Sequence, residues 1–307
     1  MKPLYLIFVL ALFIACSTPP NKQADKDTVF ANWGKAYSSG EWEQTLFYLD
    51  TLKALGIDLH NDILIKAECY AGLGKYNKAI SILEKEIELD TMPDIHYIYK
   101  TLGDVLYLKG EIEKAISAYK KTIDIRPSYA RPYVNLGKIY EKQGDKVNSI
   151  NNYLDAVKLF LSNYCYNEAA EFSYKVLDID ASNIDAHKYL DYALQNLNEY
   201  ENALFIALRL DSILESKKLW DERHDNWLFT GMTAYKCKNY KLALDLISNA
   251  MQFERIRQDF GWLGYCYLSA ISIKQGNKES AEKYANAAKE LSDKDANAFI
   301  QELVDKK

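Results

Sequence analysis

The chain has 307 residues, of which 43 are acidic and 38 are basic, so its formal net charge is −5. Hydrophobic residues make up 49% of it, which supplies a folded core and excludes a disordered polymer. The acidic balance argues against a nucleic-acid partner, because such binders present clustered lysine and arginine. Only 13 glycines and 6 prolines occur, and this composition predicts an all-α protein.

The N-terminus carries a short apolar segment behind a positive charge. Lys2 precedes an unbroken apolar run at 4–14, which suits the central region of a secretory signal, whereas a transmembrane helix needs roughly 20 residues. The run ends at Leu12 to Cys16 with Ala15 before the cysteine, and this segment resembles the lipobox of bacterial lipoproteins, with Phe13 in place of the usual Leu. An ordinary secretory signal with an incidental cysteine is the alternative.

The lipobox resemblance implies an order of segments. Residues 1–15 are then a signal peptide, Cys16 is the lipidated N-terminus, and residues 16–27, polar and with paired prolines, form a flexible tether. Two acyl chains on the cysteine anchor a protein to a membrane stably. By analogy with Gram-negative lipoproteins, Ser17 after the cysteine favours the outer membrane, so we expect a cell-envelope protein that faces the periplasm.

An internal period organises the rest of the chain. The pattern Tyr-x2-Leu-Gly-x6-Gly-x4-Ala-x3-Tyr from Tyr99 to Tyr119 recurs 34 residues later from Tyr133 to Tyr153, with Ser in place of Ala. This pattern resembles the tetratricopeptide repeat. Large residues fill the space between two antiparallel helices, while small residues such as Gly103 let the helices approach closely.

The period extends outward with one irregularity. The turn positions are Gly40, Gly74, Gly110, Gly144, Asn198, Lys238 and Gly276. The long interval from Gly144 to Asn198 predicts one extra helix at about 167–177. The resemblance implies a right-handed superhelical α-solenoid of about seven helical hairpins over 28–293. Residues 294–307 are expected to form a capping helix, since its apolar residues recur at helical spacing up to Val304.

The sequence carries no recognisable catalytic or metal-binding pattern. Cysteines stand at 16, 69, 165, 237 and 266 without zinc-type spacing, and the four histidines are scattered. We expect no metal, no cofactor and no enzyme activity. Cys237 and Cys266 lie on neighbouring repeats and are open to pairing, although free thiols are the preferred interpretation.

Function is therefore expected on a surface. The resemblance places a ligand groove on the concave face of the first helices, at Tyr97, Lys100, Tyr107, Arg131 and Lys138. That stretch is mixed in charge, and Asp104 stands where the family's peptide-carboxylate clamp has Asn. In the later repeats the same face carries an apolar strip, Leu228, Met232, Tyr235, Ala270 and Ile273, which invites a partner segment. Coverage of this strip by the protein's own segments, near Trp220 or at the helix ending at Val304, is the alternative.

The leading hypothesis is a lipid-anchored cell-envelope scaffold that binds another envelope protein or peptide through the concave groove, with no nucleic-acid partner. A glycan or small-nutrient receptor is the alternative, because 24 Tyr, 11 Phe and 5 Trp offer stacking surfaces. A hydrolase ranks third.

Overall fold

The computed structural model describes residues 22–57, 59, 61–89, 94–292 and 295–305. The predicted signal peptide and the lipidation site Cys16 lie outside these residues. In the described part of the chain there are sixteen α-helices and no strand, so the all-α class is confirmed. The chain folds as two compact units that divide between Pro127 and Ser128.

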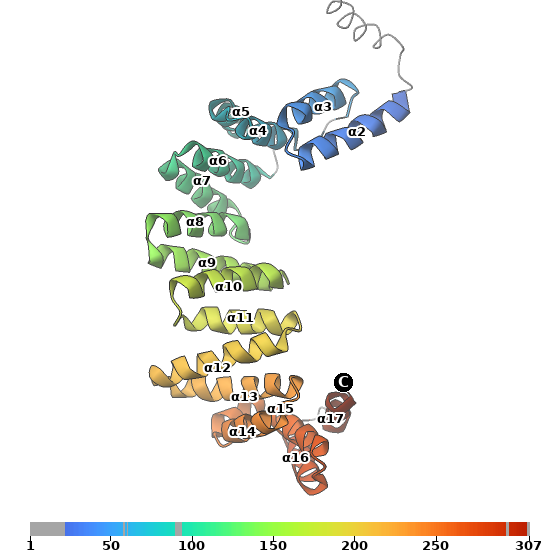
Figure 1. The fold of residues 1–307 in the computed structure, drawn as a ribbon, viewed down its shortest axis with the longest axis vertical. Helices are drawn as coiled ribbons and strands as arrows, with labels where there is room; N and C mark the ends of the chain where they lie inside the picture. The colour runs from blue at the N-terminus through green and yellow to red at the C-terminus, as the bar shows by residue number, and fades with distance from the viewer. Residues whose placement is uncertain (1–21, 58, 60, 90–93, 293–294, 306–307) are drawn as a thin grey trace, which may run out of the picture. The chain divides into compact units, whose positions relative to one another are not determined.

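The first unit consists of three helical hairpins (Figure 1). Its helices are α2 (Lys22–Ser38), α3 (Trp42–Ala54), α4 (Asp62–Gly72), α5 (Tyr76–Leu89), α6 (Ile95–Lys109) and α7 (Ile112–Ile125). Because α2 begins at Lys22, the helical array starts within the segment predicted as tether, and the predicted boundary at residue 28 is too late.

The second unit continues the succession of antiparallel helices (Figure 1). Its helices are α8 (Ala130–Gln143), α9 (Lys146–Ser162), α10 (Tyr166–Ile179), α11 (Ile184–Asn196), α12 (Tyr200–Ser216), α13 (Trp220–Lys236), α14 (Tyr240–Ala250), α15 (Glu254–Lys274), α16 (Lys278–Leu291) and α17 (Ala296–Asp305). The predicted extra helix is α10, which packs between α9 and α11. The array of seven hairpins plus one extra helix is thereby confirmed.

Close helix approach explains the glycines of the regular hairpins. A Cβ atom on Gly103 in α6 would lie 2.7 Å from the Tyr119 ring of α7, and one on Gly137 in α8 would lie 2.6 Å from the Tyr153 ring of α9. Both tyrosine rings are buried, so neither has room to retreat. The backbone of the first helix therefore lies directly on an aromatic ring of the second helix.

The predicted turn positions adopt the left-handed backbone conformation that ends a helix. Gly110 has φ 89° and Gly144 has φ 76°. Asn198 and Lys238 occupy the same conformation, at φ 62° and 59°, although they carry side chains. Their shared conformation shows that turn position rather than residue type identifies the repeat.

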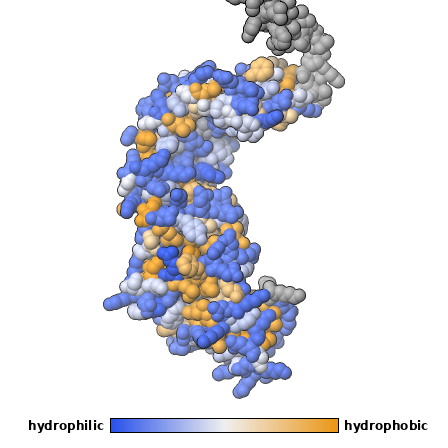
Figure 2. All heavy atoms as spheres, in the orientation of Figure 1, coloured by the Kyte–Doolittle hydropathy of each residue, from blue (hydrophilic) through white to orange (hydrophobic). Residues whose placement is uncertain are grey.

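The last hairpins of the second unit share one hydrophobic core. Helices α13 to α17 all contribute to it, and α17 packs against both α15 and α16. On the face drawn in Figure 2, hydrophobic side chains gather over the middle helices of the second unit. Exposed apolar residues of that region include Phe205, which is 61% exposed, and a groove of about 320 Å³ separates α10 from α12 beside it.

No helix among the described residues combines the length and the apolar character that a membrane crossing requires.

Candidate functional site

The predicted apolar strip is buried, which corrects the expectation of an exposed groove there. Leu228 and Ala270 are fully buried, and Met232 and Tyr235 are each 7% exposed. Of the five residues predicted in this strip, Ile273 is the exposed one, at 41%.

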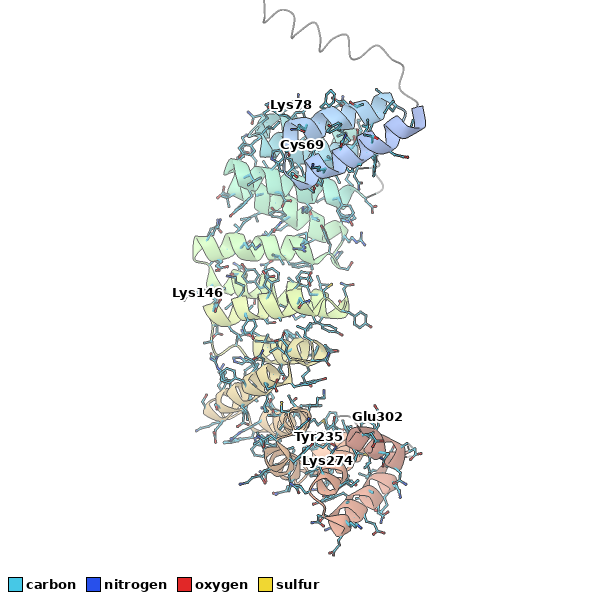
Figure 3. All side chains as sticks on the ribbon, turned by 45° about the vertical axis from the view of Figure 1, so that its right-hand side comes forward. Cys69, Lys78, Lys146, Tyr235, Lys274 and Glu302 are labelled. Carbon is cyan, nitrogen blue, oxygen red and sulfur yellow. The ribbon has the colours of Figure 1, made fainter. Side chains whose placement is uncertain are left out.

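Helix α17 lies against one end of this strip. The Tyr235 hydroxyl donates a hydrogen bond to the Leu303 carbonyl at 2.9 Å, and the Lys274 ammonium donates to the carbonyl of Val304. Figure 3 shows Tyr235 and Lys274 beside the helix that carries Glu302. The C-terminal helix therefore contacts the strip at Tyr235, as the alternative of self-coverage expects.

Three of the other predicted partner-binding residues lie on α6 in the first unit. Tyr97 is 36% exposed and its ring lies 4.1 Å from the His96 ring, while Tyr107 is half-buried. Lys100 forms an ion pair with Asp104 at 2.7 Å, and the Tyr119 hydroxyl donates to the same carboxylate. This surface is polar, and its opposite charges already pair with each other.

The remaining two, Arg131 and Lys138, lie on α8 in the second unit and are exposed. The Lys138 ammonium lies 5.9 Å from the centre of the Phe172 ring, within reach of a cation–π interaction. Nearby on the same helix, Glu141 accepts a hydrogen bond from Tyr153 at 2.7 Å. Of the five polar residues of the predicted groove, three thus lie in the first unit and two in the second.

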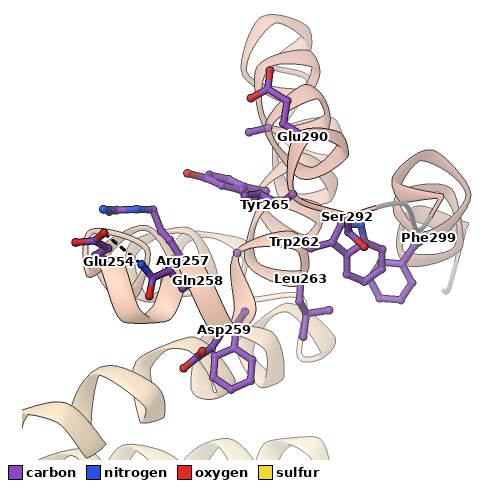
Figure 4. Close-up of a pocket in the computed structure, with 14 residues that line it drawn as sticks. Glu254, Arg257, Gln258, Asp259, Trp262, Leu263, Tyr265, Glu290, Ser292 and Phe299 are labelled. Carbon is purple, nitrogen blue, oxygen red and sulfur yellow. Dashed lines mark hydrogen bonds between the residues drawn. The ribbon is translucent and has the colours of Figure 1, made fainter.

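A larger concavity lies at the end of the second unit. It has a volume of about 820 Å³ and is formed by the N-terminal half of α15, the end of α16 and the side of α17 (Figure 4). We call it the α15–α17 cleft. Its lining residues are Glu254, Arg257, Gln258, Asp259, Phe260, Gly261, Trp262, Leu263, Tyr265, Ala287, Glu290, Leu291, Ser292 and Phe299. A volume in this range is typical of ligand pockets.

The backbone around the cleft is fixed by close packing. A Cβ atom on Gly264 would lie 2.5 Å from the Met251 sulfur, so the end of α14 lies directly against α15. The Arg257 guanidinium donates to the carbonyls of Met251 and Gln252, at 2.9 and 2.7 Å, and satisfies the free carbonyls at the end of α14. Arg257 thus has a structural role at one wall of the cleft.

Aromatic side chains form much of the remaining wall. The Trp262 and Phe299 rings have centroids 5.1 Å apart, and Tyr265 stacks on Tyr284 at 6.2 Å. Phe260 meets Phe229 of α13 edge to face at 5.4 Å. Each ring is held by a neighbouring ring, so the apolar wall is preorganised for contact with a ligand.

Acidic groups stand at the edge of this aromatic wall. Glu254, Asp259 and Glu290 are exposed, and Glu254 accepts a hydrogen bond from the Gln258 amide at 3.2 Å. Arg257 is the one basic residue among the lining side chains. The cleft is therefore aromatic inside and negative at its edge.

A shielded carboxylate lies elsewhere in the second unit, on α11. The Gln195 amide donates to Asp191 Oδ2 at 2.8 Å, while buried Oδ1 has no hydrogen-bond partner among the described residues. Burial raises the pKa of Asp191 to about 6, against the hydrogen bond of Gln195 and the positive charge of Lys236, which lower it.

Nothing else in the described part of the chain points to catalysis. No group of three or more His, Cys, Asp or Glu side chains there is placed to hold a metal ion. Cys237 and Cys266 are both free thiols rather than a disulfide. Burial raises the pKa of Cys69 and of Cys266 to about 11, which keeps both thiols protonated near neutral pH.

The cleft was missed at the sequence level, although its aromatic residues were visible. Phe260, Trp262 and Tyr265 lie on one helix, but in a repeat protein such residues are expected in the core. After α16 the chain forms the single short helix α17 beside them, and the repeat period carries no signal for that geometry.

Comparisons with known proteins agree with the helical pairs. The family model described as TPR repeat matches residues 103–144, and the model described as tetratricopeptide repeat matches residues 64–91 and 130–163. A TPR repeat-containing protein of Methanocaldococcus jannaschii is 26% identical over 202 residues, which are 65% of this chain and 32% of that protein.

Two further proteins are similar to this chain over part of its length. Kinesin light chain-related 2 of Arabidopsis thaliana is 37% identical over 81 residues, 24% of this chain and 12% of that protein. The crystal structure of YrrB, a TPR protein with an unusual peptide-binding site, is 17% identical with a TM-score of 0.42, over 72% of this chain and 96% of that one. The chain spans about a third or less of the length of the first curated relatives that it matches.

Proposed function

From the premise that the chain contains tetratricopeptide repeats, we propose that it is an adaptor that holds a segment of another cell-envelope protein in the α15–α17 cleft. The proposal includes attachment of the body to a membrane through lipid at Cys16. It places the protein on the periplasmic side of an outer membrane.

The cleft carries the binding part of this proposal. Its volume is about 820 Å³, against about 320 Å³ for the groove between α10 and α12. Its rings and charges stand on three helices that pack against one another, so a ligand meets rigid walls. Four of the five residues of the predicted strip on α13 and α15, by contrast, are buried.

The anchoring part rests on sequence alone. Lys2, the apolar run at 4–14 and Cys16 have the order of a lipoprotein signal, and all lie outside the described residues. A lipid anchor would restrict the cleft to partners near the membrane surface, which suits an adaptor between envelope proteins.

A glycan or small-nutrient receptor is a second candidate, and one observation favours it. Trp262, Tyr265 and Phe299 present aromatic surface in the same cleft as carboxylates and amides, and sugars stack on aromatic rings and hydrogen-bond to such groups. The pairing of Trp262 with Phe299 leaves less ring face free for stacking, which is why the protein partner ranks first.

Capture from crosslinked envelopes tests the binding proposal. Leu291 lines the cleft and is 51% exposed, so Leu291→Trp should obstruct the cleft without disturbing the core. Wild type should return a defined envelope protein, and Leu291→Trp should lose it. A matched control is Val147→Trp, which alters a 69% exposed apolar residue on α9. Equal recovery with all three chains would refute the cleft as the partner site.

Labelling with a fatty acid tests the anchor separately. The wild-type chain should incorporate the label and partition into detergent, whereas Cys16→Ser should do neither. Equal labelling of the two chains would remove the lipid anchor from the proposal and leave the adaptor role intact.

A further inference from the structure

We propose that the segment held in the α15–α17 cleft is cationic, with a lysine or arginine side chain lying against the aromatic wall and its charge among the carboxylates. This inference rests on the proposed function, because it names the chemistry of the partner at the same site. It does not depend on the lipid anchor.

The charges of the cleft favour a positive ligand. Glu254, Asp259 and Glu290 line it, and among the described residues none of the three forms an ion pair. Arg257 is the one positive charge that lines the cleft, so its lining side chains carry three acidic groups against one basic group. Arg255 on α15 also interacts electrostatically with Asp259, and its guanidinium is bound to Asp225 at 2.9 Å. The lining of the cleft therefore carries an excess of negative charge.

The one basic lining residue does not make the cleft an anion site. One nitrogen of the Arg257 guanidinium is committed to two backbone carbonyls, those of Met251 and Gln252. A bidentate grip on a ligand carboxylate needs two free parallel N–H donors, and this commitment weakens that geometry. An acidic segment would also enter a cleft lined by three carboxylates and one guanidinium, which is unfavourable.

The aromatic wall suits the same type of side chain. Trp262 and Tyr265 offer ring faces and edges beside the carboxylates, and Leu291 and Leu263 add aliphatic surface. Lysine and arginine lay their hydrocarbon stems on apolar surface and keep the charged group at the edge. A cation over an aromatic face gains about 0.5–2 kcal/mol, depending on how far water is excluded. The wall and the acidic edge thus recognise the two ends of one side chain.

Selection from a random peptide library tests this inference and needs no identified partner. The library would be displayed on phage and selected against the full chain in neutral detergent. Recovered peptides should be enriched in lysine and arginine. Their affinity should fall at least tenfold for Asp259→Lys combined with Glu290→Lys, which corresponds to about 1.4 kcal/mol. Added salt should weaken binding as well, because the edge of the cleft is exposed.

A control variant separates the cleft from general charge. Asp245→Lys combined with Glu282→Lys makes the same change in net charge at exposed positions on α14 and α16 that do not line the cleft. The selected peptides should bind this control as they bind wild type. Equal losses in both variants would show a non-specific charge effect and overturn the inference.

The remaining outcomes also decide the matter. Enrichment of neutral or acidic peptides, or no enrichment, would refute a cationic ligand. Suppose that such peptides, or the captured envelope protein, bind wild type but not Leu291→Trp. The adaptor function then stands, and only the cationic character of the ligand is refuted. Suppose instead that no cationic peptides are enriched and that Leu291→Trp captures the envelope protein as well as wild type does. Both the cationic ligand and the cleft as the partner site are then refuted.

Discussion

The α8–α9 hairpin and the α13–α17 end of the second unit use the same way of packing two helices but expose different surfaces. In the first, the Ser149 hydroxyl donates to the Gly137 carbonyl at 3.0 Å, and a buried Tyr153 ring covers Gly137. In the second, the Ser269 hydroxyl donates to the Ala281 carbonyl at 2.8 Å across α15 and α16. Both hairpins therefore join their helices through a small residue and a buried serine.

The two regions differ in what covers the first helix. On α8, Arg131 and Lys138 remain exposed. On α13 and α15, Met232 and Tyr235 are buried, and the Tyr235 hydroxyl bonds to α17, which also contributes Phe299 to the cleft. The comparison teaches that the first helix of a regular hairpin keeps charged residues exposed, whereas the single helix α17 both contacts a buried strip and helps to form a cleft.

The largest expected effect tests whether the strip on α13 is truly covered. Met232→Glu should lower the free energy of unfolding by about 3 kcal/mol or more, because it buries an unpaired charge in the core shared with α17. Ile273→Lys, at an exposed position in the same predicted strip, should change it by less than about 0.5 kcal/mol. Chemical denaturation of both variants measures the difference. Near-equal effects would mean that α17 does not cover the strip.

The next effect contrasts two glycines. Gly137→Ala should cost about 2 kcal/mol, since the new Cβ would lie 2.6 Å from a buried aromatic ring. Gly261→Ala in the cleft should cost well under about 1 kcal/mol, because its Cβ would meet the end of Leu291, which is 51% exposed and free to turn away. Thermal melting of the two variants would check the order, and a reversed order would contradict the difference in packing at the two glycine positions.

A pH effect follows from Asp191, which stands between these regions on α11. Its pKa in the folded chain is about 6, above the ordinary value of 3.8, so the folded state favours the protonated carboxyl. Its contribution to stability is therefore fully present below the ordinary pKa and is lost as pH rises through about 6.

Replacing this carboxylate should remove the loss of stability above about pH 6. Asp191→Asn should be more stable than wild type at neutral pH by about 1–2 kcal/mol, and the two chains should converge near pH 4. Urea unfolding across this pH range measures the gap. A gap that stays constant with pH would show that Asp191 titrates normally in the folded chain.

The smallest effect tests the feature that the two regions share. Ser149→Ala and Ser269→Ala each remove one buried hydrogen bond to a carbonyl, so each should cost about 1 kcal/mol. Equal losses in the free energy of unfolding would support a stabilising serine–carbonyl hydrogen bond in both hairpins. A loss confined to Ser149→Ala would limit this stabilisation to the regular repeats.

Much of the fold was predictable because the small residues and turn residues of each helix pair recur at regular intervals in the sequence. Gly103, Ala115 and the turn glycines recur at fixed spacing, and the broken interval before Asn198 located α10. Asp191 stands as far before Asn198 as Gly103 stands before Gly110, so a carboxylate at a close-packing position was also visible in the sequence. Its raised pKa is the physical consequence of that position.

The candidate site was much less predictable. Met232 and Tyr235 follow the repeat pattern whether or not another helix covers them, because a period reports packing within a hairpin and not contact with a later segment. The same limit hid the cleft, since its walls come from α15, α16 and α17, and no spacing relates Trp262 to Leu291 or Phe299. Long-range contacts of this kind follow from how the array ends.

The most direct test of the central claim, that the partner binds at the irregular end and not on the regular repeats, is site-specific photo-crosslinking in intact cells. A photo-reactive amino acid would replace Leu291 in the cleft in one chain and exposed Lys138 on α8 in another. We expect a discrete adduct with one envelope protein from position 291 and none from position 138. An adduct from position 138 with none from position 291 would contradict the account.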